Sequence, residues 1–330
     1  MMKIAMIFAK SLRGQIFSDY IMEQMHAIGD IAVNETDDTS PDTIKRILSG
    51  ADIAVTSWKT PKLDADILDA APDLKLIAHA AGSVKPVVSD AVWERRIRVT
   101  GSPKPLGYGV AETALGLSIV ASKNIFYHEK NTAAGGWSEG KKHVRELFDI
   151  TVGVIGAGCV GKHYIHLMHN FDVSILVYDP FLTEEAAERI GVKKTDLETL
   201  LESSDIVSVH APSIPETYHM LNAHTLPLMK RDAVLINTAR GSIIDEDALY
   251  QHMKAGNLKY ACLDVTDPEP PAKDHPLRSL PNVILTPHLA GLVNNGKRRI
   301  GMHVLQEIQR FLAGEPMECE VTSDILDRLA

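Results

Sequence analysis

Short runs of apolar residues alternate along the chain with stretches whose apolar positions recur at helical spacing. In the N-terminal part, the runs that we predict to be strands are 3–8, 31–33, 53–56 and 76–79. A second series comprises 152–155, 173–178, 206–210, 233–237, 260–263 and 283–285. Strands that alternate with helices form parallel sheets, so both series predict α/β architecture. The second series predicts a doubly wound sheet of the Rossmann type.

Two long apolar helical stretches, 109–127 and 292–311, lie where the two series meet. A chain of 330 residues is longer than one core usually spans, so two domains are expected. We expect the chain to leave the first domain, build the second and return to the first. The first domain is then discontinuous, with residues 1–101 and 292–330, and the second contains residues 102–291.

A glycine-rich turn opens the second series, between an apolar run and a helix-compatible stretch. It begins with Gly156 and Gly158, continues through Cys159 and Val160, and ends with Gly161. In this G-x-G-x-x-G pattern the first glycine permits a tight turn and the second lets a pyrophosphate approach the backbone. The third lets the helix pack close to the strand. The N-terminus of the helix adds unpaired N–H donors and a positive dipole, so we predict a dinucleotide site.

Asp179 closes the next apolar run, where a carboxylate accepts the ribose hydroxyls of a dinucleotide. Its charge disfavours the extra phosphate of NADP, so NAD is the expected cofactor. The turn also reads as most of a P-loop, from Gly156 to Lys162. A P-loop needs Ser or Thr at the next position to hold Mg²⁺, and His163 is a poor ligand for that cation. A structural glycine-rich turn is the other alternative for this motif alone.

Three later strands of the second series are followed by residues suited to acid–base chemistry. Arg240, Glu269 and His288 each follow a strand, at the edge where open α/β sheets bind ligands. A guanidinium matches a carboxylate, an imidazole exchanges a proton near neutral pH, and a carboxylate holds the imidazole. Together they predict transfer of a hydride and a proton between a 2-hydroxy acid and its 2-keto acid. Singly they are ambiguous, because arginines form surface ion pairs and both His79 and His210 end strands too.

Composition limits the possible partners. The formal net charge is −9 and there is no basic block, which argues against nucleic acid as the main partner. The apolar stretch Met1 to Ala9 is too short for a signal peptide or a membrane span. The three cysteines are far apart and fit no disulfide or metal pattern. We therefore expect a cytoplasmic protein that binds small molecules, with no metal, membrane or nucleic-acid site.

These motifs, in this order and over nearly the whole chain, resemble the D-isomer-specific 2-hydroxyacid dehydrogenases. The resemblance rests on the glycine fingerprint with Asp179 and on four later segments: His210 to Pro212 with Thr217, Asn237 to Gly241, Asp264 to Pro270, and Pro287 to Gly291. It implies that Arg240, Glu269 and His288 are catalytic and that Asp264 bonds the nicotinamide carboxamide. It also implies a flavodoxin-like substrate domain and homodimers formed through the cofactor domain. The expected cofactor contacts are Gly156, Gly158, Cys159, Val160, Gly161, Asp179, His210, Ala211, Pro212, Thr217, Thr238, Ala239, Asp264, His288 and Gly291.

The expected substrate pocket departs from the family pattern. The loop after the fourth strand usually carries two glycines and an Asp, whereas here it runs from Ala81 to Lys85. Its Gly82 and Ser83 N–H groups are candidates to bind the substrate carboxylate. Lys85 either favours a dianionic acid or faces solvent, and Trp58 either walls the pocket or packs in the core. The predicted substrate contacts are Trp58, Gly82, Ser83 and Arg240.

Two alternative functions remain from the sequence. A formate-type dehydrogenase is disfavoured, because its relatives have Gln where this chain has Glu269. A non-catalytic NAD-sensing module of the same fold is the second alternative, in which Arg240 and His288 serve no reaction. Cys159 replaces an Arg that many relatives have, and we expect a packed thiol there with no catalytic role.

Overall fold

The computed structural model describes residues 2–291 and 295–329. The chain divides into two compact units, Met1–Leu106 with Val293–Ala330, and Gly107–Leu292. The first boundary therefore lies at Leu106 and not at residue 101 as predicted, because Leu106 packs against the core of the first unit. The predicted start of the last helix, at 292, lies outside the described residues.

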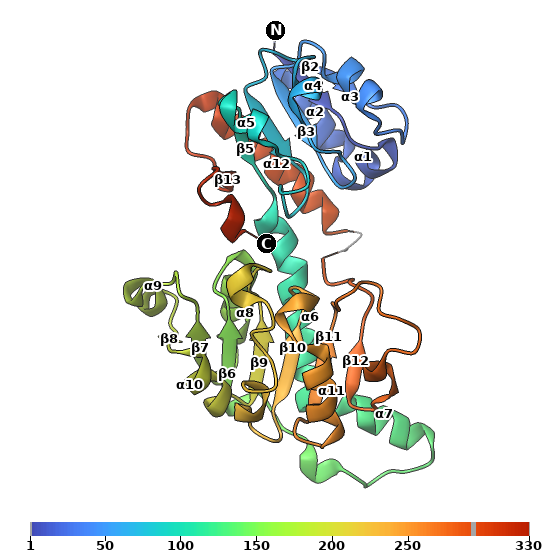
Figure 1. Ribbon diagram of the computed structural model, residues 1–330, viewed down its shortest axis with the longest axis vertical. Coiled ribbons are helices and arrows are strands. Elements are labelled where there is room, and N and C mark those ends of the chain that lie inside the picture. The colour runs from blue at the N-terminus through green and yellow to red at the C-terminus, as the bar shows by residue number, and fades with distance from the viewer. Residues whose placement is uncertain (1, 292–294, 330) are drawn as a thin grey trace. The chain divides into compact units, whose positions relative to one another are not determined.

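The first unit contains a six-stranded sheet (Figure 1). Its strands are β1 (Lys3–Met6), β2 (Asp30–Val33), β3 (Ile53–Thr56), β4 (Leu76–His79), β5 (Arg98–Thr100) and β13 (Glu320–Val321), in the order β13-β5-β4-β3-β1-β2. All pairs are parallel except that of β13 with β5. The order 2-1-3-4-5 is that of flavodoxin, so the predicted flavodoxin-like fold is confirmed. Strands β5 and β13 were not predicted, since three and two residues carry no readable period.

Helices cover both faces of this sheet. They are α1 (Lys10–Ile16), α2 (Asp19–Ile28), α3 (Pro41–Leu48), α4 (Ala65–Leu68), α5 (Asp90–Glu94) and α12 (Lys297–Ala313). Residues of β1, and Ile7 directly after it, alternate between the faces, because side chains of an extended chain point to opposite sides in turn. Ile4 and Met6 pack with α1, α2 and α12, while Ala5 and Ile7 pack with α3, α4 and α5.

The second unit contains a parallel, seven-stranded sheet. Its strands are β6 (Phe148–Ile155), β7 (Asp172–Tyr178), β8 (Lys193–Lys194), β9 (Ile206–Val209), β10 (Val234–Asn237), β11 (Tyr260–Leu263) and β12 (Val283–Leu285), in the order β12-β11-β10-β9-β6-β7-β8. This is the doubly wound Rossmann order, which confirms the predicted fold class. The two-residue β8 was not predicted.

Helices α6 (Pro103–Ser122) and α8 (Cys159–Met168) pack on one face of this sheet, and α10 (Leu197–Ser203) and α11 (Glu246–Lys254) pack on the other. Helices α7 (Ile125–Ala133) and α9 (Glu184–Arg189) complete the unit. The prediction of one helix over 109–127 was wrong. Asn124 adopts a left-handed conformation, with φ of 57°, and separates α6 from α7. None of the helices in the described part of the chain has the length and apolarity needed to cross a membrane.

Candidate active site

The glycine turn after β6 has the geometry of a phosphate-binding loop. Gly156 has φ of +92°, and a Cβ added there would lie 2.8 Å from the backbone nitrogen of Ala211. A Cβ at Gly161 would lie 2.0 Å from the carbonyl oxygen of Gly156. Both positions therefore require glycine. A Cβ at Gly158 would meet no atom within 4 Å, which leaves open space at the N-terminus of α8.

Asp179 lies directly after β7 and is tied to this turn. Its Oδ2 accepts a hydrogen bond from the backbone N–H of Ala157 at 2.7 Å, and its Oδ1 accepts one from the N–H of Phe181 at 2.8 Å. A carboxylate has about four acceptor sites, so lone pairs remain for ribose hydroxyls. The structure thus brings Asp179 to the fingerprint, as a dinucleotide site requires.

The loop after β9 is closed by Thr217. Its hydroxyl donates to the carbonyl of Pro212 at 2.6 Å and accepts from the N–H of Ile214 at 3.0 Å. His210 bonds the hydroxyl of Ser208 through Nε2 at 2.9 Å, and burial lowers its pKa to about 3. The ring is therefore neutral at physiological pH. Among the described residues, nothing bonds the buried Nδ1 of His210.

Asn237, at the end of β10, holds the turn that carries Arg240. Its amide donates to the carbonyl of Arg240 at 2.8 Å, and its oxygen accepts from the N–H of Ala239 at 3.0 Å. Burial lowers the pKa of the Arg240 guanidinium, and the nearby Glu269 carboxylate opposes that effect. Asn237 was in the motif that we recognised, but its role as a brace was not predicted because no local pattern reveals it.

Gly241 lets this turn contact the loop after β11. A Cβ there would lie 2.1 Å from the carbonyl carbon of Thr266, so only glycine permits the contact. The N–H of Thr266 in turn donates to Oε1 of Glu269 at 3.2 Å. The loops that carry Arg240 and Glu269 therefore pack backbone to backbone, although the two residues are far apart in sequence.

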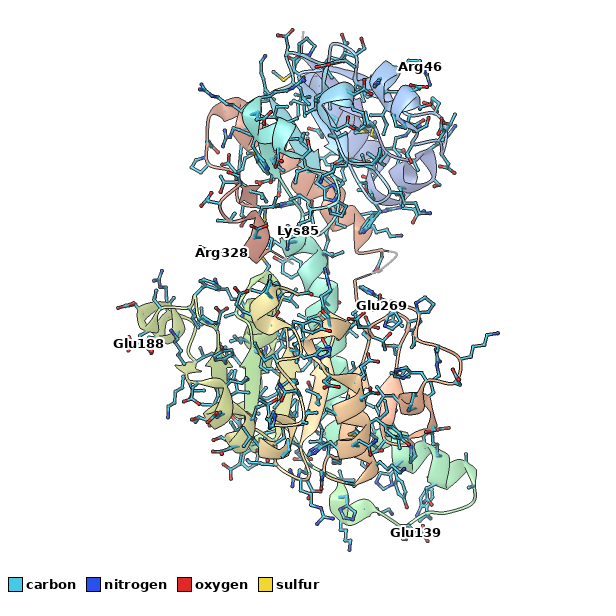
Figure 2. All side chains as sticks on the ribbon, viewed as in Figure 1. Arg46, Lys85, Glu139, Glu188, Glu269 and Arg328 are labelled. Atoms are coloured by element: carbon cyan, nitrogen blue, oxygen red, sulfur yellow. The ribbon has the colours of Figure 1, made fainter. Side chains whose placement is uncertain are left out.

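The structure brings Glu269 and His288 together. Nδ1 of the imidazole lies 2.8 Å from Oε2 of the carboxylate, and both side chains are partly exposed. His288 has φ of 50°, a left-handed conformation that is uncommon for residues other than glycine. Figure 2 shows Glu269 at the carboxyl-end edge of the sheet in the second unit, where α/β proteins bind ligands.

Asp264 holds the loop that carries His288. Its side chain is buried, with 1% exposed, and accepts from the hydroxyl of Thr286 at 2.6 Å. It also accepts from the N–H groups of Leu289 at 3.0 Å and Ala290 at 2.9 Å. Its backbone carbonyl accepts from the N–H of His288 at 2.9 Å. The expected contact of Asp264 with a nicotinamide stays a prediction, whereas its contacts with this loop are observed.

The predicted substrate residues Trp58, Gly82 and Ser83 lie in the first unit, after β3 and β4. Trp58 is partly buried and packs against the core beneath α1, α2 and α12. Lys85 donates to the backbone carbonyls of Asp327 and Leu329 in the C-terminal tail, and Figure 2 shows it near Arg328 of that tail. Its charge is therefore directed at the tail.

The second unit fits a nicotinamide dinucleotide. The open space at Gly158 suits a pyrophosphate, and Asp179 suits a ribose. The buried hydroxyl of Thr238, at the end of β10, is bonded by none of the described residues. Gly156, Gly161 and Gly241 have no room for side chains, so the loops of this region pack backbone to backbone. Within the described ranges, no group of three or more His, Cys, Asp or Glu side chains is arranged to hold a metal ion.

Comparison with known proteins adds independent evidence. The sequence model described as "D-isomer specific 2-hydroxyacid dehydrogenase, NAD binding domain" matches residues 115–290. A glyoxylate reductase of Thermofilum pendens is 34% identical over 304 residues, which cover 90% of this chain and 89% of that protein. A D-3-phosphoglycerate dehydrogenase of Archaeoglobus fulgidus is 36% identical over 264 residues, 80% of this chain. The chain spans about half the length of the phosphoglycerate dehydrogenases that it matches, at 50% and 56%.

A solved structure of similar fold is an acyclic imino acid reductase in complex with NADPH and D-arginine. It has a TM-score of 0.77 and 26% sequence identity, and the match covers 97% of this chain and 100% of that chain. The predicted two-domain fold and the predicted nicotinamide cofactor are therefore confirmed at the level of NAD(P). The preference for NAD over NADP stays a prediction that rests on Asp179.

Proposed function

Because the chain belongs to the D-isomer-specific 2-hydroxyacid dehydrogenase family, we propose that it is an NAD-dependent oxidoreductase that interconverts a D-2-hydroxy acid and its 2-keto acid. The observation that carries the proposal is the 2.8 Å pair of His288 and Glu269, together with Arg240 on the adjoining loop. An acid–base pair and a carboxylate-binding cation at one sheet edge are what this reaction requires.

The roles follow from the chemistry of each group. The nicotinamide supplies or accepts the hydride when it is bound. The Arg240 guanidinium binds the substrate carboxylate and polarises the adjacent carbonyl. Since Nδ1 of His288 is engaged by Glu269, Nε2 is the nitrogen that gives its proton to the carbonyl oxygen in reduction. The Glu269 carboxylate stabilises the imidazolium and fixes the ring, and in the oxidative direction the neutral imidazole accepts the proton.

The cofactor that we propose is NAD, and the substrate that we propose is a small acid without a phosphate group. Asp179 beside the fingerprint favours a ribose with both hydroxyls free over one with a phosphate. Lys85 is the one cation in the loop from Ala81 to Lys85, and it is engaged by tail carbonyls, so this loop offers no free cation for a second negative charge. Glyoxylate and hydroxypyruvate are therefore the first acids to test.

We also propose that the protein forms a homodimer through its second unit. Exposed apolar side chains lie in its segment 125–148, including Trp137 with 72% and Phe148 with 63% of their surface exposed. Apolar surface concentrated in one segment is typical of an interface. Light scattering should give twice the chain mass, and Trp137→Ala with Phe148→Ser should shift the protein towards monomer. A cytoplasmic location is proposed from the sequence alone, and cell fractionation tests it.

The activity is tested by loss of NADH absorbance with a panel of 2-keto acids, with NADPH in parallel. The variants Arg240→Ala, Glu269→Gln and His288→Ala should lose turnover by about 100-fold or more, as is usual for acid–base groups. His224→Ala, which removes an exposed histidine elsewhere in the second unit, should retain activity. Binding of NADH without turnover of any acid would favour the NAD-sensing module, and turnover of formate would favour the formate-type enzyme.

A further inference from the structure

We infer that Glu246 is a positioning residue whose carboxylate holds both ends of the loop that carries Glu269, and so keeps Glu269 on His288. Its effect on the reaction rests on the proposed function. The contacts that support this role all lie within the second unit, between the start of α11 and the loop after β11.

The loop that carries Glu269 has little apolar packing of its own. After the buried Thr266, residues 267–274 are exposed except for Pro271, which is partly buried. The next buried side chain is that of Leu277, in the short 3-10 helix η5 (Pro276–Ser279). A segment with few buried apolar contacts opens easily, so polar contacts must fix its position.

Glu246, the first residue of α11, connects the two ends of this loop. Its Oε1 accepts a hydrogen bond from the backbone N–H of Asp267 at 3.0 Å. Its Oε2 lies 3.0 Å from Nε2 of His275, the residue directly before η5. The side chains of Glu246 and His275 are only 10% and 17% exposed, so both contacts are shielded from water. One carboxylate therefore holds the first and the last residue of the segment 267–275.

The contact with His275 is an ion pair, because Oε2 of Glu246 forms no hydrogen bond with any residue that the structure describes. Burial raises the pKa of Glu246, and the N–H of Asp267 and the His275 ring oppose that effect. The like charges of Asp267 and Asp247 also raise it. Taking a carboxylate out of water costs free energy that such contacts return only in part. Glu246 therefore fixes geometry more than it adds stability.

The end of the loop that Glu246 holds is the end from which Glu269 is oriented. The N–H of Thr266, directly before Asp267, donates to Oε1 of Glu269 at 3.2 Å. This leaves Oε2 of Glu269 for Nδ1 of His288, at 2.8 Å. A shift of the Thr266–Asp267 peptide would thus move the catalytic carboxylate with it. Glu246 acts through Glu269 and takes no part in proton transfer itself.

Two substitutions at this position separate reach from charge. Glu246→Ala releases both ends of the loop, and we expect kcat for the keto acid to fall about tenfold or more, because small displacements of catalytic groups have effects of this size. In Glu246→Gln the amide oxygen still accepts from Asp267, so kcat should stay within about threefold of the wild type. Asp247→Ala removes an exposed carboxylate from the same helix and should leave kcat unchanged.

A double-mutant cycle with Glu269→Gln tests whether Glu246 acts through Glu269. Residues that act through one another have effects that do not add. Glu246→Ala should therefore change the residual kcat of Glu269→Gln by less than about twofold. A purely structural role would lower kcat by the same factor in both backgrounds. If Glu246→Ala does not fold, His275→Ala releases one end of the loop and should show the same dependence on Glu269.

The position of Glu269 is read independently of turnover from the tautomer of His288. In a neutral imidazole, the hydrogen bond at one nitrogen decides which nitrogen carries the proton. With histidine labelled by ¹⁵N, the signals of His288 are assigned as those lost in His288→Ala. At alkaline pH they should show the proton on Nδ1 in the wild type, Glu246→Gln and Asp247→Ala. Glu246→Ala should show a mixture of both tautomers.

The outcomes distinguish this role from the proposed function. A wild type that turns over keto acids, with kcat and the His288 tautomer unchanged in Glu246→Ala, overturns the role of Glu246 and leaves the reaction standing. Equal losses of kcat in both backgrounds, with an unchanged tautomer, also overturn the role. A wild type without turnover, whose His288 tautomer is fixed and becomes mixed in Glu246→Ala, keeps the role and overturns the reaction.

Discussion

Two fingerprint glycines make opposite predictions when each is replaced by alanine. At Gly158 a Cβ meets no protein atom within 4 Å, and φ of −72° is suitable for any residue. The free energy of unfolding should therefore change by no more than about 0.5 kcal/mol. The new methyl group occupies the space into which the pyrophosphate must fit. We expect the Kd for NADH to rise at least about tenfold, equivalent to about 1.4 kcal/mol.

At Gly161 the same substitution acts on the protein itself. The Cβ would lie 2.0 Å from the carbonyl oxygen of Gly156 and 3.5 Å from Cβ of His210. Backbone cannot rotate aside as a side chain can, so α8 must move away from β6. Overpacking of this kind costs about 1–3 kcal/mol of stability. Gly161→Ala should therefore lose both stability and NADH affinity, whereas Gly158→Ala should lose affinity alone.

Urea denaturation of the protein without cofactor measures the stabilities, and titration of NADH fluorescence measures the affinities. Gly116→Ala, inside α6 with no atom within 4 Å of its Cβ, is the matched control. It should gain up to about 1 kcal/mol from helix propensity and keep the affinity for NADH. Wild-type affinity in Gly158→Ala would refute the pyrophosphate position, and wild-type stability in Gly161→Ala would refute the packing argument.

Three further predictions concern other parts of the molecule. Asp264→Asn should lower the free energy of unfolding by about 2 kcal/mol and reduce kcat. The reason is that an amide cannot accept all the hydrogen bonds that the carboxylate accepts from the loop that holds His288. An unchanged kcat, with only KM for NADH raised, would instead support direct contact with the nicotinamide. His79 should make stability depend on pH, since its pKa is about 4 in the folded protein and about 6.5 when unfolded. The unfolded chain binds more protons between these pH values, so the free energy of unfolding is highest above about pH 6.5 and falls by about 3 kcal/mol towards pH 4. Denaturation curves of His79→Gln should lack this pH dependence. The same pH dependence in that variant as in the wild type would contradict the prediction. Gly241→Ala should separate its turn from Thr266, because the added Cβ would lie 2.1 Å from the carbonyl carbon of that residue. We expect kcat to fall by about tenfold or more, since small misplacements of catalytic groups have effects of this size. An unchanged kcat at saturating keto acid would show that the contact is unimportant.

Much of the second unit was predictable from the sequence, because its signals are local. The spacing of Gly156, Gly158 and Gly161 between a strand and a helix specifies a phosphate-binding turn, whatever the rest of the chain does. Apolar runs that alternate with helices specify parallel strands. Parallel strands end at one edge of their sheet, so Arg240 and His288 were expected near each other although 48 positions separate them.

Other features depended on the tertiary structure because the partners are distant in sequence or the signal is too short. Strands of two or three residues have no period, and the break at Asn124 interrupts a continuous helical pattern. His79 ended a strand like other histidines in the sequence, and only the structure showed that its ring is buried and bonded to the hydroxyl of Thr56. The sequence left the role of Lys85 open, and the structure shows that its ammonium donates to backbone carbonyls of the C-terminal tail. Local spacing therefore determined the elements and their chemistry, whereas burial and long-range partners decided which polar groups face a ligand and which hold the protein together.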